Sequence, residues 1–160
     1  MSVVASWALT IDANETLEDG VDASSSPVVN HAAFSTSGVY NAGSTVPATK
    51  VSYDSIALVA GAHTIDLQAL PGTNGTTVNG DTLKVQLFKF KNTGTNAMTI
   101  SEGAANGYAL LGAAFSFILL KDQEVLFQLA NTAPDIAAAD SEIDIAGTGV
   151  ETFQMSIVMG

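Results

Sequence analysis

Short segments in which apolar and polar residues alternate dominate the last third of the chain, and Asn, Gly and Asp separate them. They occupy residues 98–100, 115–120, 125–129, 141–145 and 152–159. Short strands at such regular spacing are typical of an all-β sandwich or barrel. We therefore predict an all-β, antiparallel, jelly-roll-like sandwich with little or no helix. One helical turn is expected at 133–140, where Pro134 suits a first helical position.

The amino-terminal part of the chain divides into a strand and a polar segment. Apolar residues recur at every second position from Val3 to Ile11, which is the period of a strand. Residues 13–50 are rich in Ser, Thr, Asn, Ala and Gly, so we expect mostly loop there, with weak strands near 28–34. A loop of this length is either ordered by neighbouring subunits or is a solvated excursion. Residues 1–160 are expected to form one domain.

Three pairs of neighbouring segments have the local pattern of hairpins. Residues 83–91 precede 98–100 across an Asn- and Gly-rich turn, and 115–120 precede 125–129. Residues 55–60 and 63–70 form either a hairpin or a corner between two sheets. Within 83–91 the apolar face changes phase between Leu87 and Phe88. This change indicates either a β-bulge at that point or a strand buried on both faces.

The charge of the chain argues against several classes of function. Sixteen Asp and Glu stand against five Lys and no Arg, for a formal net charge of −11. Lys and Arg supply most affinity for phosphates, so neither nucleic acids nor phosphorylated ligands are expected partners. The absence of cysteine removes disulfides and thiolate metal sites. No apolar run has the length of a membrane-spanning helix, and the amino terminus lacks the basic start of a secretory signal, so no membrane association is expected.

Few side chains have the spacing of a catalytic or metal site, and we expect neither an enzyme nor a cofactor. His63 precedes Asp66 by three residues, so on a strand the two would point to opposite faces. Asp140, Glu142 and Asp144 alternate in a strand-like segment and would share one face. These carboxylates are candidates for binding a cation such as Ca²⁺. The alternative is the solvent-facing side of an amphipathic strand.

Several apolar and aromatic residues are candidates for contact with a partner. Tyr40 and Tyr108 lie near glycines in expected loops. The first strand combines apolar alternation with a following segment that cannot fold compactly alone. Its residues are therefore expected to contact neighbouring subunits: Val3, Ala5, Trp7 and Leu9. For Trp7 the alternative is burial, because it alternates with core-type residues.

Asn- and Gly-rich turns with their flanking strands carry a family resemblance. The segments are Lys91-Asn92-Thr93-Gly94-Thr95-Asn96-Ala97-Met98-Thr99-Ile100, Gly103, Asn106-Gly107-Tyr108 and Ser141-Glu142-Ile143-Asp144-Ile145-Ala146-Gly147-Thr148-Gly149. Over about residues 83–160 they resemble small virion structural proteins of tailed bacteriophages, of the head decoration or cement type. The resemblance implies a jelly-roll or related sandwich on the virion surface, made in the host cytoplasm, with the major capsid protein as its partner.

Two functions follow as expectations. The first is a capsid-stabilising subunit that forms a homo-oligomer, with a trimer favoured, because edge strands that need cover suit a symmetric assembly. The alternative is a carbohydrate-binding or adhesive sandwich of a tail fibre or cell surface, with exposed Tyr and Trp as its platform.

Overall fold

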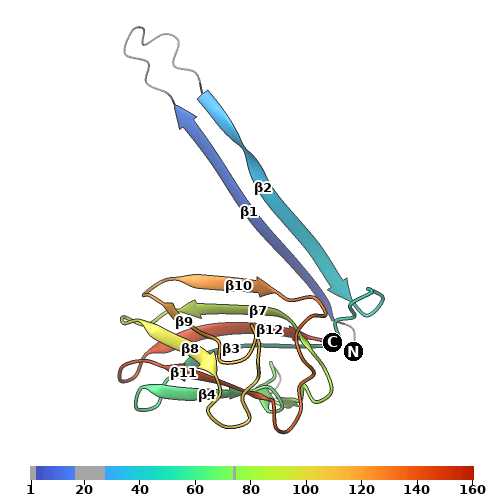
Figure 1. Ribbon diagram of the computed structural model, residues 1–160, viewed down its shortest axis with the longest axis vertical. Coiled ribbons are helices and arrows are strands. Elements are labelled where there is room, and N and C mark those ends of the chain that lie inside the picture. The colour runs from blue at the N-terminus through green and yellow to red at the C-terminus, as the bar shows by residue number, and fades with distance from the viewer. Residues whose placement is uncertain (1–2, 17–27, 74) are drawn as a thin grey trace. The chain divides into compact units, whose positions relative to one another are not determined.

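The computed structural model describes residues 3–16, 28–73 and 75–160, and every regular element in them is a strand (Figure 1). They form two compact units: a hairpin, Ala5–Val39, and a sandwich built from Tyr40–Gly160 with the first residues of the chain. The single domain expected over residues 1–160 stays a prediction, and the hairpin and the sandwich are each a separate compact unit. Among the described residues there is no helix of the length and hydropathy that a membrane span needs.

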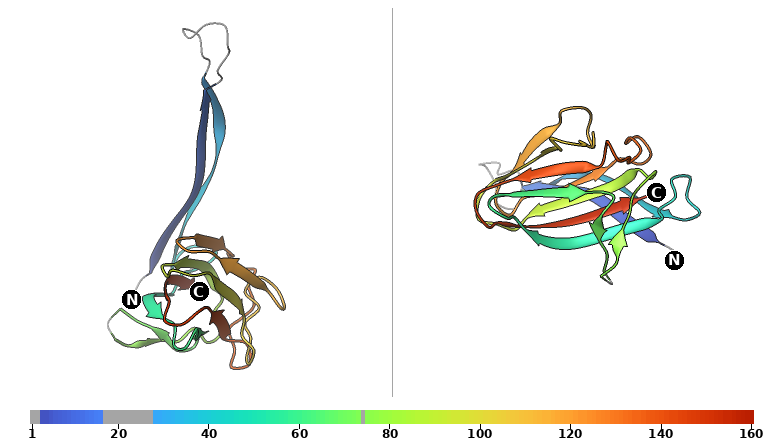
Figure 2. Two further views of the ribbon diagram at one scale, coloured as in Figure 1. Left: turned by 90° about the vertical axis from the view of Figure 1, so that its left-hand side faces the viewer. Right: turned by 90° about the horizontal axis from the view of Figure 1, so that it is seen from below.

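The sandwich consists of two four-stranded antiparallel sheets, seen from two further sides in Figure 2. The first, here the β7–β12 sheet, has the order β10 (Glu124–Gln128), β7 (Val85–Asn92), β12 (Thr152–Met159) and β3 (Lys50–Ala57). The second, the β8–β11 sheet, has the order β4 (Ala62–Asp66), β11 (Glu142–Ala146), β8 (Met98–Glu102) and β9 (Ser116–Leu119). A small pair, β5 (Leu70–Pro71) and β6 (Thr77–Val78), interrupts the connection from β4 to β7.

The connectivity is that of a jelly roll, which confirms the predicted fold class. Among these eight strands, the chain changes sheet at every connection except the one from β8 to β9. This arrangement of eight strands is the double Greek key. The predicted hairpins of 83–91 with 98–100 and of 115–120 with 125–129 are therefore wrong. A tight turn can join partners in one sheet or strands of facing sheets, and the local pattern is the same in both cases.

The core lies between the two sheets. Phe90 stacks on Phe88 and Phe153 with ring centroids 6.2 and 4.6 Å apart. From the opposite sheet, Ile143 and Ile145 of β11 close the same space and are almost completely buried. Full burial of one such side chain contributes about 1.5–3 kcal/mol relative to exposure. The inward side of each alternating strand thus accounts for the packing of the sandwich.

A β-bulge in β7 keeps the apolar residues in phase with the core. In the pairing with β12, the register moves from Leu87 to Val85 at consecutive residues of β12, so Gln86 is the extra residue. Val85 and Phe88 are consequently both buried although they lie three positions apart. The predicted bulge exists, and it lies one residue before the expected place.

Most of the described part of the loop expected at 13–50 belongs instead to a β-hairpin. β1 (Val4–Thr16) and β2 (Val28–Asn41) form a two-stranded sheet, so the weak strand expected at 28–34 is part of a longer one. Small and polar residues are common in loops, but Thr and Val also fit a pleated strand when a neighbouring strand completes the hydrogen-bond ladder. Residues 17–27 of the expected loop lie outside the described part of the chain.

The helical turn expected at 133–140 is not formed. Ala137 and Asp140 pair instead in an isolated β-bridge, in which each amide donates to the other's carbonyl at 3.2 and 2.9 Å. Ile136 is buried in the core, so the segment follows the sandwich rather than its own helix propensity.

Candidate functional site

One face of the hairpin is organised around Trp7. The ring of Trp7 lies over Gly38, where an added Cβ would be 2.8 Å from Cζ2 of the indole. On the other face, the hydroxyl oxygens of Thr10 and Ser35 lie 3.3 Å apart. Both contacts agree with a single antiparallel register. Since side chains alternate along a strand, the Trp7 face of β1 comprises Ala5, Trp7, Leu9 and Ile11.

The Trp7 face is apolar and partly open to solvent. Leu9 is 42% exposed and Ile11 is 73% exposed, while Ala5 and Trp7 are half-buried. A two-stranded sheet has no core of its own and is marginally stable at best in water. The Trp7 face is therefore a surface that gains free energy when another surface covers it. Ala5, Trp7 and Leu9, three of the contact residues expected from the sequence, lie on it.

Val3 and Tyr40 take other positions. Val3 precedes β1 and is 8% exposed within the sandwich unit, so its side chain is not available to a partner and that prediction is wrong. Tyr40 is half-buried, and its hydroxyl oxygen accepts a hydrogen bond from Nε2 of Gln128 in β10. This bond connects the start of the sandwich unit to β10, and Tyr40 is partly exposed.

Tyr108 is not a contact residue, contrary to the expectation from its Gly-rich surroundings. It is completely buried and is among the largest side chains of the core. Its hydroxyl donates to the carbonyl of Pro134 at 2.8 Å and accepts from the amide of Val85 at 3.3 Å. Burial raises the pKa of Tyr108 to about 12. A buried Tyr needs a partner for its hydroxyl, and the neighbouring connection supplies one.

A shallow groove crosses the outer face of the β7–β12 sheet. Side chains of four strands line it: Tyr53, Lys89, Lys91, Glu124, Gln154 and Ser156. Lys91 lies opposite Gln154 on β12, and Lys89 lies opposite Ser156. Tyr53 is 56% exposed at the side of β3. The groove therefore presents two ammonium groups, a carboxylate, an amide, a hydroxyl and an aromatic ring on one open surface.

The outer face of the β8–β11 sheet is acidic. Glu142 lies opposite Asp66, and Asp144 lies opposite Thr64. The hydroxyl of Thr64 donates to Oδ1 of Asp144 at 2.7 Å, and the amide of Ala104 donates to Oδ2 at 2.8 Å. These bonds fix the orientation of Asp144 and leave the face with a net negative charge.

The three candidate cation ligands are not gathered into one site. Glu142 and Asp144 lie on β11, whereas Asp140 lies in the bridge that precedes it. Within the described ranges, no group of three or more His, Cys, Asp and Glu is placed to hold a metal ion. Ile143 and Ile145 occupy the inner side of the same strand. The arrangement is that of an amphipathic strand with its carboxylates outward.

His63 and Asp66 do not form a catalytic dyad, as expected from their spacing. Along β4 the ring of His63 points inward, 5.7 Å from the ring of Phe153, while Asp66 lies on the outer face. Burial lowers the pKa of His63, against the smaller effect of Asp54, which raises it. The imidazole is a packed side chain at the margin of the core.

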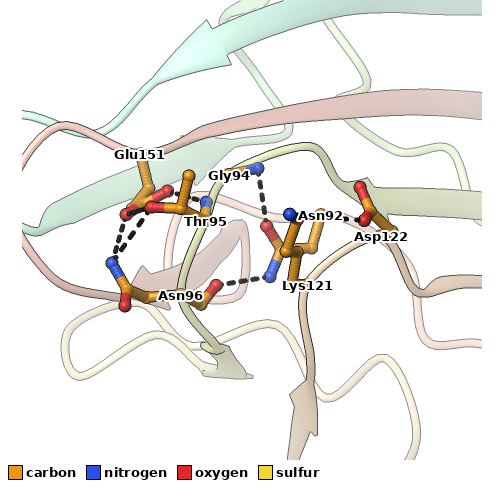
Figure 3. Close-up of polar contacts among 7 residues, drawn as sticks. All are labelled: Asn92, Gly94, Thr95, Asn96, Lys121, Asp122 and Glu151. Carbon is orange, nitrogen blue, oxygen red and sulfur yellow. Dashed lines mark hydrogen bonds and ion pairs between the residues drawn. The ribbon is translucent and has the colours of Figure 1, made fainter.

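Glu151, which precedes β12, is hydrogen-bonded to the connection between β7 and β8 (Figure 3). Its carboxylate accepts hydrogen bonds from the backbone amide of Thr95, from the Thr95 hydroxyl at 2.9 Å and from the side-chain amide of Asn96. These donors lower the pKa of Glu151, the amide of Thr95 contributing most. Both carboxylate oxygens of Glu151 accept hydrogen bonds from Thr95 and Asn96, so the role of Glu151 is structural.

Asn92 completes the same end from inside the sandwich (Figure 3). Its Nδ2 donates to the carbonyls of Asn96 and Leu119 at 2.8 and 3.0 Å, and its Oδ1 accepts from the amide of Gly94 at 2.9 Å. Asn92 is fully buried. The Asn-Thr-Gly-Thr-Asn run thus specifies a turn rather than a ligand site.

The groove residues were singled out by the sequence only in part. Tyr53 fits the general expectation of exposed Tyr and Trp side chains as a sugar-binding platform, whereas no sequence motif indicated Lys89 and Lys91. A signal existed, because both lysines alternate with the buried Phe88 and Phe90 and therefore share the outer face of one strand. Their convergence with β12 and β3 depends on strand order, which the sequence does not reveal.

Comparison with known proteins identifies no family. No family model matches the chain, and no curated protein is detectably similar. Among solved structures, one similar chain is described as "Bacillus endospore appendages form a novel family of disulfide-linked pili". The match covers 68% of this chain and 85% of that chain, with 16% identity and a TM-score of 0.33. Similarity at this level says nothing about function.

Proposed function

We propose that the protein is a structural subunit of a symmetric assembly, with the β1–β2 hairpin as its assembly arm and the surface of a tailed-phage capsid as its setting. The observation that carries this proposal is the exposed apolar Trp7 face on a sheet of two strands, 13 and 14 residues long. The proposed role is mechanical rather than catalytic, and it depends on surfaces rather than on a reactive side chain.

Physical chemistry supports an arm that is completed by a partner. The hairpin forms a compact unit separate from the sandwich, and its strands pair only with each other among the described elements. Three or more strands, or packing against another element, are needed to stabilise such a sheet. Covering Leu9 and Ile11 would contribute about 1.5–3 kcal/mol for each side chain that becomes fully buried. Association with other subunits supplies the missing surface.

The capsid setting comes from the resemblance of residues 83–160 to head decoration proteins. The jelly roll agrees with the fold that this resemblance implies. An acidic chain without Arg suits a role outside the shell, away from the packaged nucleic acid. The major capsid protein is accordingly the proposed partner, and the virion surface is the proposed location.

Light scattering of the purified protein tests the proposal. We expect an oligomer, and we expect Leu9→Ser with Ile11→Ser to shift the mass toward the monomer. Thr10→Ala on the opposite face of β1 is the matched control and should leave the mass unchanged. A monomer at all concentrations of the unmodified protein would contradict self-assembly. Cosedimentation with capsids encoded alongside the protein then tests decoration, since a capsid that binds no protein would contradict that setting.

Carbohydrate binding is the second candidate, and the groove favours it. The platform expected from the sequence changes, because Tyr108 is buried while Tyr53 is exposed beside Lys91 and Gln154. Aromatic rings next to hydrogen-bonding side chains suit sugar binding. Glycan binding that disappears in Tyr53→Ala and persists in Tyr40→Ala would support this candidate over the structural one.

A further inference from the structure

We infer that the two outer sheet faces of the sandwich are complementary docking surfaces, through which one copy of the chain stacks on the next in a head-to-tail arrangement. This inference rests on the proposed structural function and specifies a contact that the hairpin does not provide. The occupant of each face is a second copy of this chain. Opposite charge on the two faces carries the inference.

The basic face is the outer side of the β7–β12 sheet. Lys89 and Lys91 project from neighbouring outward positions of β7. Glu124 is their acidic neighbour: it lies opposite Lys91, and its carboxylate is 3.5 Å from Nζ of Lys89. One carboxylate between two ammonium groups leaves a positive excess. Two of the five lysines of a chain with net charge −11 are thus concentrated on one open surface.

The acidic face is the outer side of the β8–β11 sheet. Asp66 and Glu142 are cross-strand neighbours, and Asp144 is the next outward residue of β11. The strands of this sheet contain no lysine, so every charged residue in β4, β8, β9 and β11 is acidic. The bonds from Thr64 and Ala104 already orient Asp144. Among the described residues these carboxylates form no metal site. In this inference they form the negatively charged surface that the basic face of a second copy contacts.

Each face also carries an exposed apolar or aromatic side chain on its edge strand. Tyr53 of β3 is 56% exposed on the basic face, and Ile118 of β9 is 62% exposed on the acidic face. Such side chains are typical anchors at protein interfaces, with charged residues around them. Charge complementarity steers two such surfaces together and disfavours contact between like faces.

The placement of the faces determines the symmetry of the contact. They lie on opposite sides of one sandwich, so a copy bound to the basic face exposes its own basic face on its far side. The contact is heterologous, and repeating it yields an extended series unless rotation between copies closes a ring. This arrangement differs from the compact trimer expected from the sequence. The second copy is favoured as the occupant because the chain itself carries both halves of the charge pair.

Charge-reversal variants and their mixture test the contact. Lys89→Glu with Lys91→Glu makes both faces acidic, and Asp66→Lys with Glu142→Lys makes both faces basic. We expect each double variant alone to self-associate about tenfold more weakly than the unmodified chain in sedimentation velocity. An equimolar mixture of the two should recover the association. Retained association of either variant alone, or a mixture that stays dissociated, would overturn the inference.

Controls separate folding, charge and the role of the hairpin. Circular dichroism melts establish that each variant is folded, and Glu142→Gln provides a neutral replacement of the same size. Lys121→Glu reverses one exposed charge outside both faces and should leave association unchanged. Higher salt should weaken association of the unmodified chain. If the charge variants assemble normally while the Leu9 and Ile11 variant does not, stacking is wrong and the proposed function stands. A protein that is monomeric under all conditions contradicts both.

Discussion

The phenol of Tyr108 donates a hydrogen bond to the carbonyl of Pro134 at 2.8 Å. This bond joins the connection between β8 and β9 to the connection between β10 and β11 at one end of the jelly roll. The amide of Val85 donates to the same phenol oxygen at 3.3 Å, so three segments meet at one buried side chain.

Removing the Tyr108 hydroxyl should destabilise the sandwich. Tyr108→Phe leaves the carbonyl of Pro134 and the amide of Val85 without this partner in a buried place, which costs about 1–3 kcal/mol in the free energy of unfolding. Urea unfolding followed by circular dichroism measures the change. Tyr53→Phe is the control and should stay within about 0.5 kcal/mol of the unmodified protein, because Tyr53 is exposed. Equal stability of the two variants would contradict the role assigned to Tyr108.

Stability should fall in strong alkali through Tyr108. Its folded-state pKa of about 12 lies above the ordinary value of 10.0, so the unfolded chain releases the proton first as the pH rises. The stabilisation from keeping the phenol neutral is present below pH 10 and is lost between about pH 10 and 12, amounting to about 2 kcal/mol. The slope of unfolding free energy against pH in this window should be smaller for Tyr108→Phe than for the unmodified chain. Parallel slopes would argue against a raised pKa.

Acid should weaken the hydrogen bonds between Glu151 and the connection from β7 to β8. Hydrogen bonds from Thr95 and Asn96 lower the folded-state pKa of Glu151, so its contribution is present above the ordinary carboxyl pKa of 4.5 and is lost as the pH falls through the lowered value. Glu151→Gln should lower stability at neutral pH and reduce the loss on acidification. Hydrogen exchange of the Thr95 amide reports the same loosening. Asp140→Asn is the control, and an identical acid response in both variants would exclude the assigned role.

Trp7 should report on the packing of the hairpin, because it is the single Trp of the chain. In Gly38→Ala the new Cβ would lie 2.8 Å from the indole, which forces the ring or the strand to move. We expect a shift in Trp fluorescence and more rapid proteolysis of the hairpin. Gly43→Ala is the matched control, since its nearest contact of 3.4 Å is ordinary. An unchanged emission spectrum in Gly38→Ala would show that the ring does not pack on that glycine.

Which residues share a side of one strand could be predicted well from the sequence. Period-two alternation puts Phe153, Met155 and Ile157 on one side of β12, and the structure buries that side in the core. The phase change in β7 indicated a bulge. The opposite orientations of His63 and Asp66 followed from their odd spacing. These features depend on neighbours along the chain, so they are visible in the sequence.

Tyr108 and the segment 13–50 show where prediction failed. A Tyr beside Gly in a loop has the local pattern of an exposed residue. Only the meeting of two connections with the first residue of β7 makes Tyr108 a core residue. Most of the described part of 13–50 is strand, since β1 and β2 satisfy each other's backbone groups. Both outcomes depend on partners far away in the sequence.

The sequence by itself determined the all-β class, the inward and outward sides of most strands, and the scarcity of positive charge. Only the tertiary structure decided which strands are neighbours, and with them the groove at Lys89 and Lys91 and the acidic face around Glu142. The physical reason is that alternation is encoded residue by residue, whereas strand order results from the burial of whole sheet faces against each other.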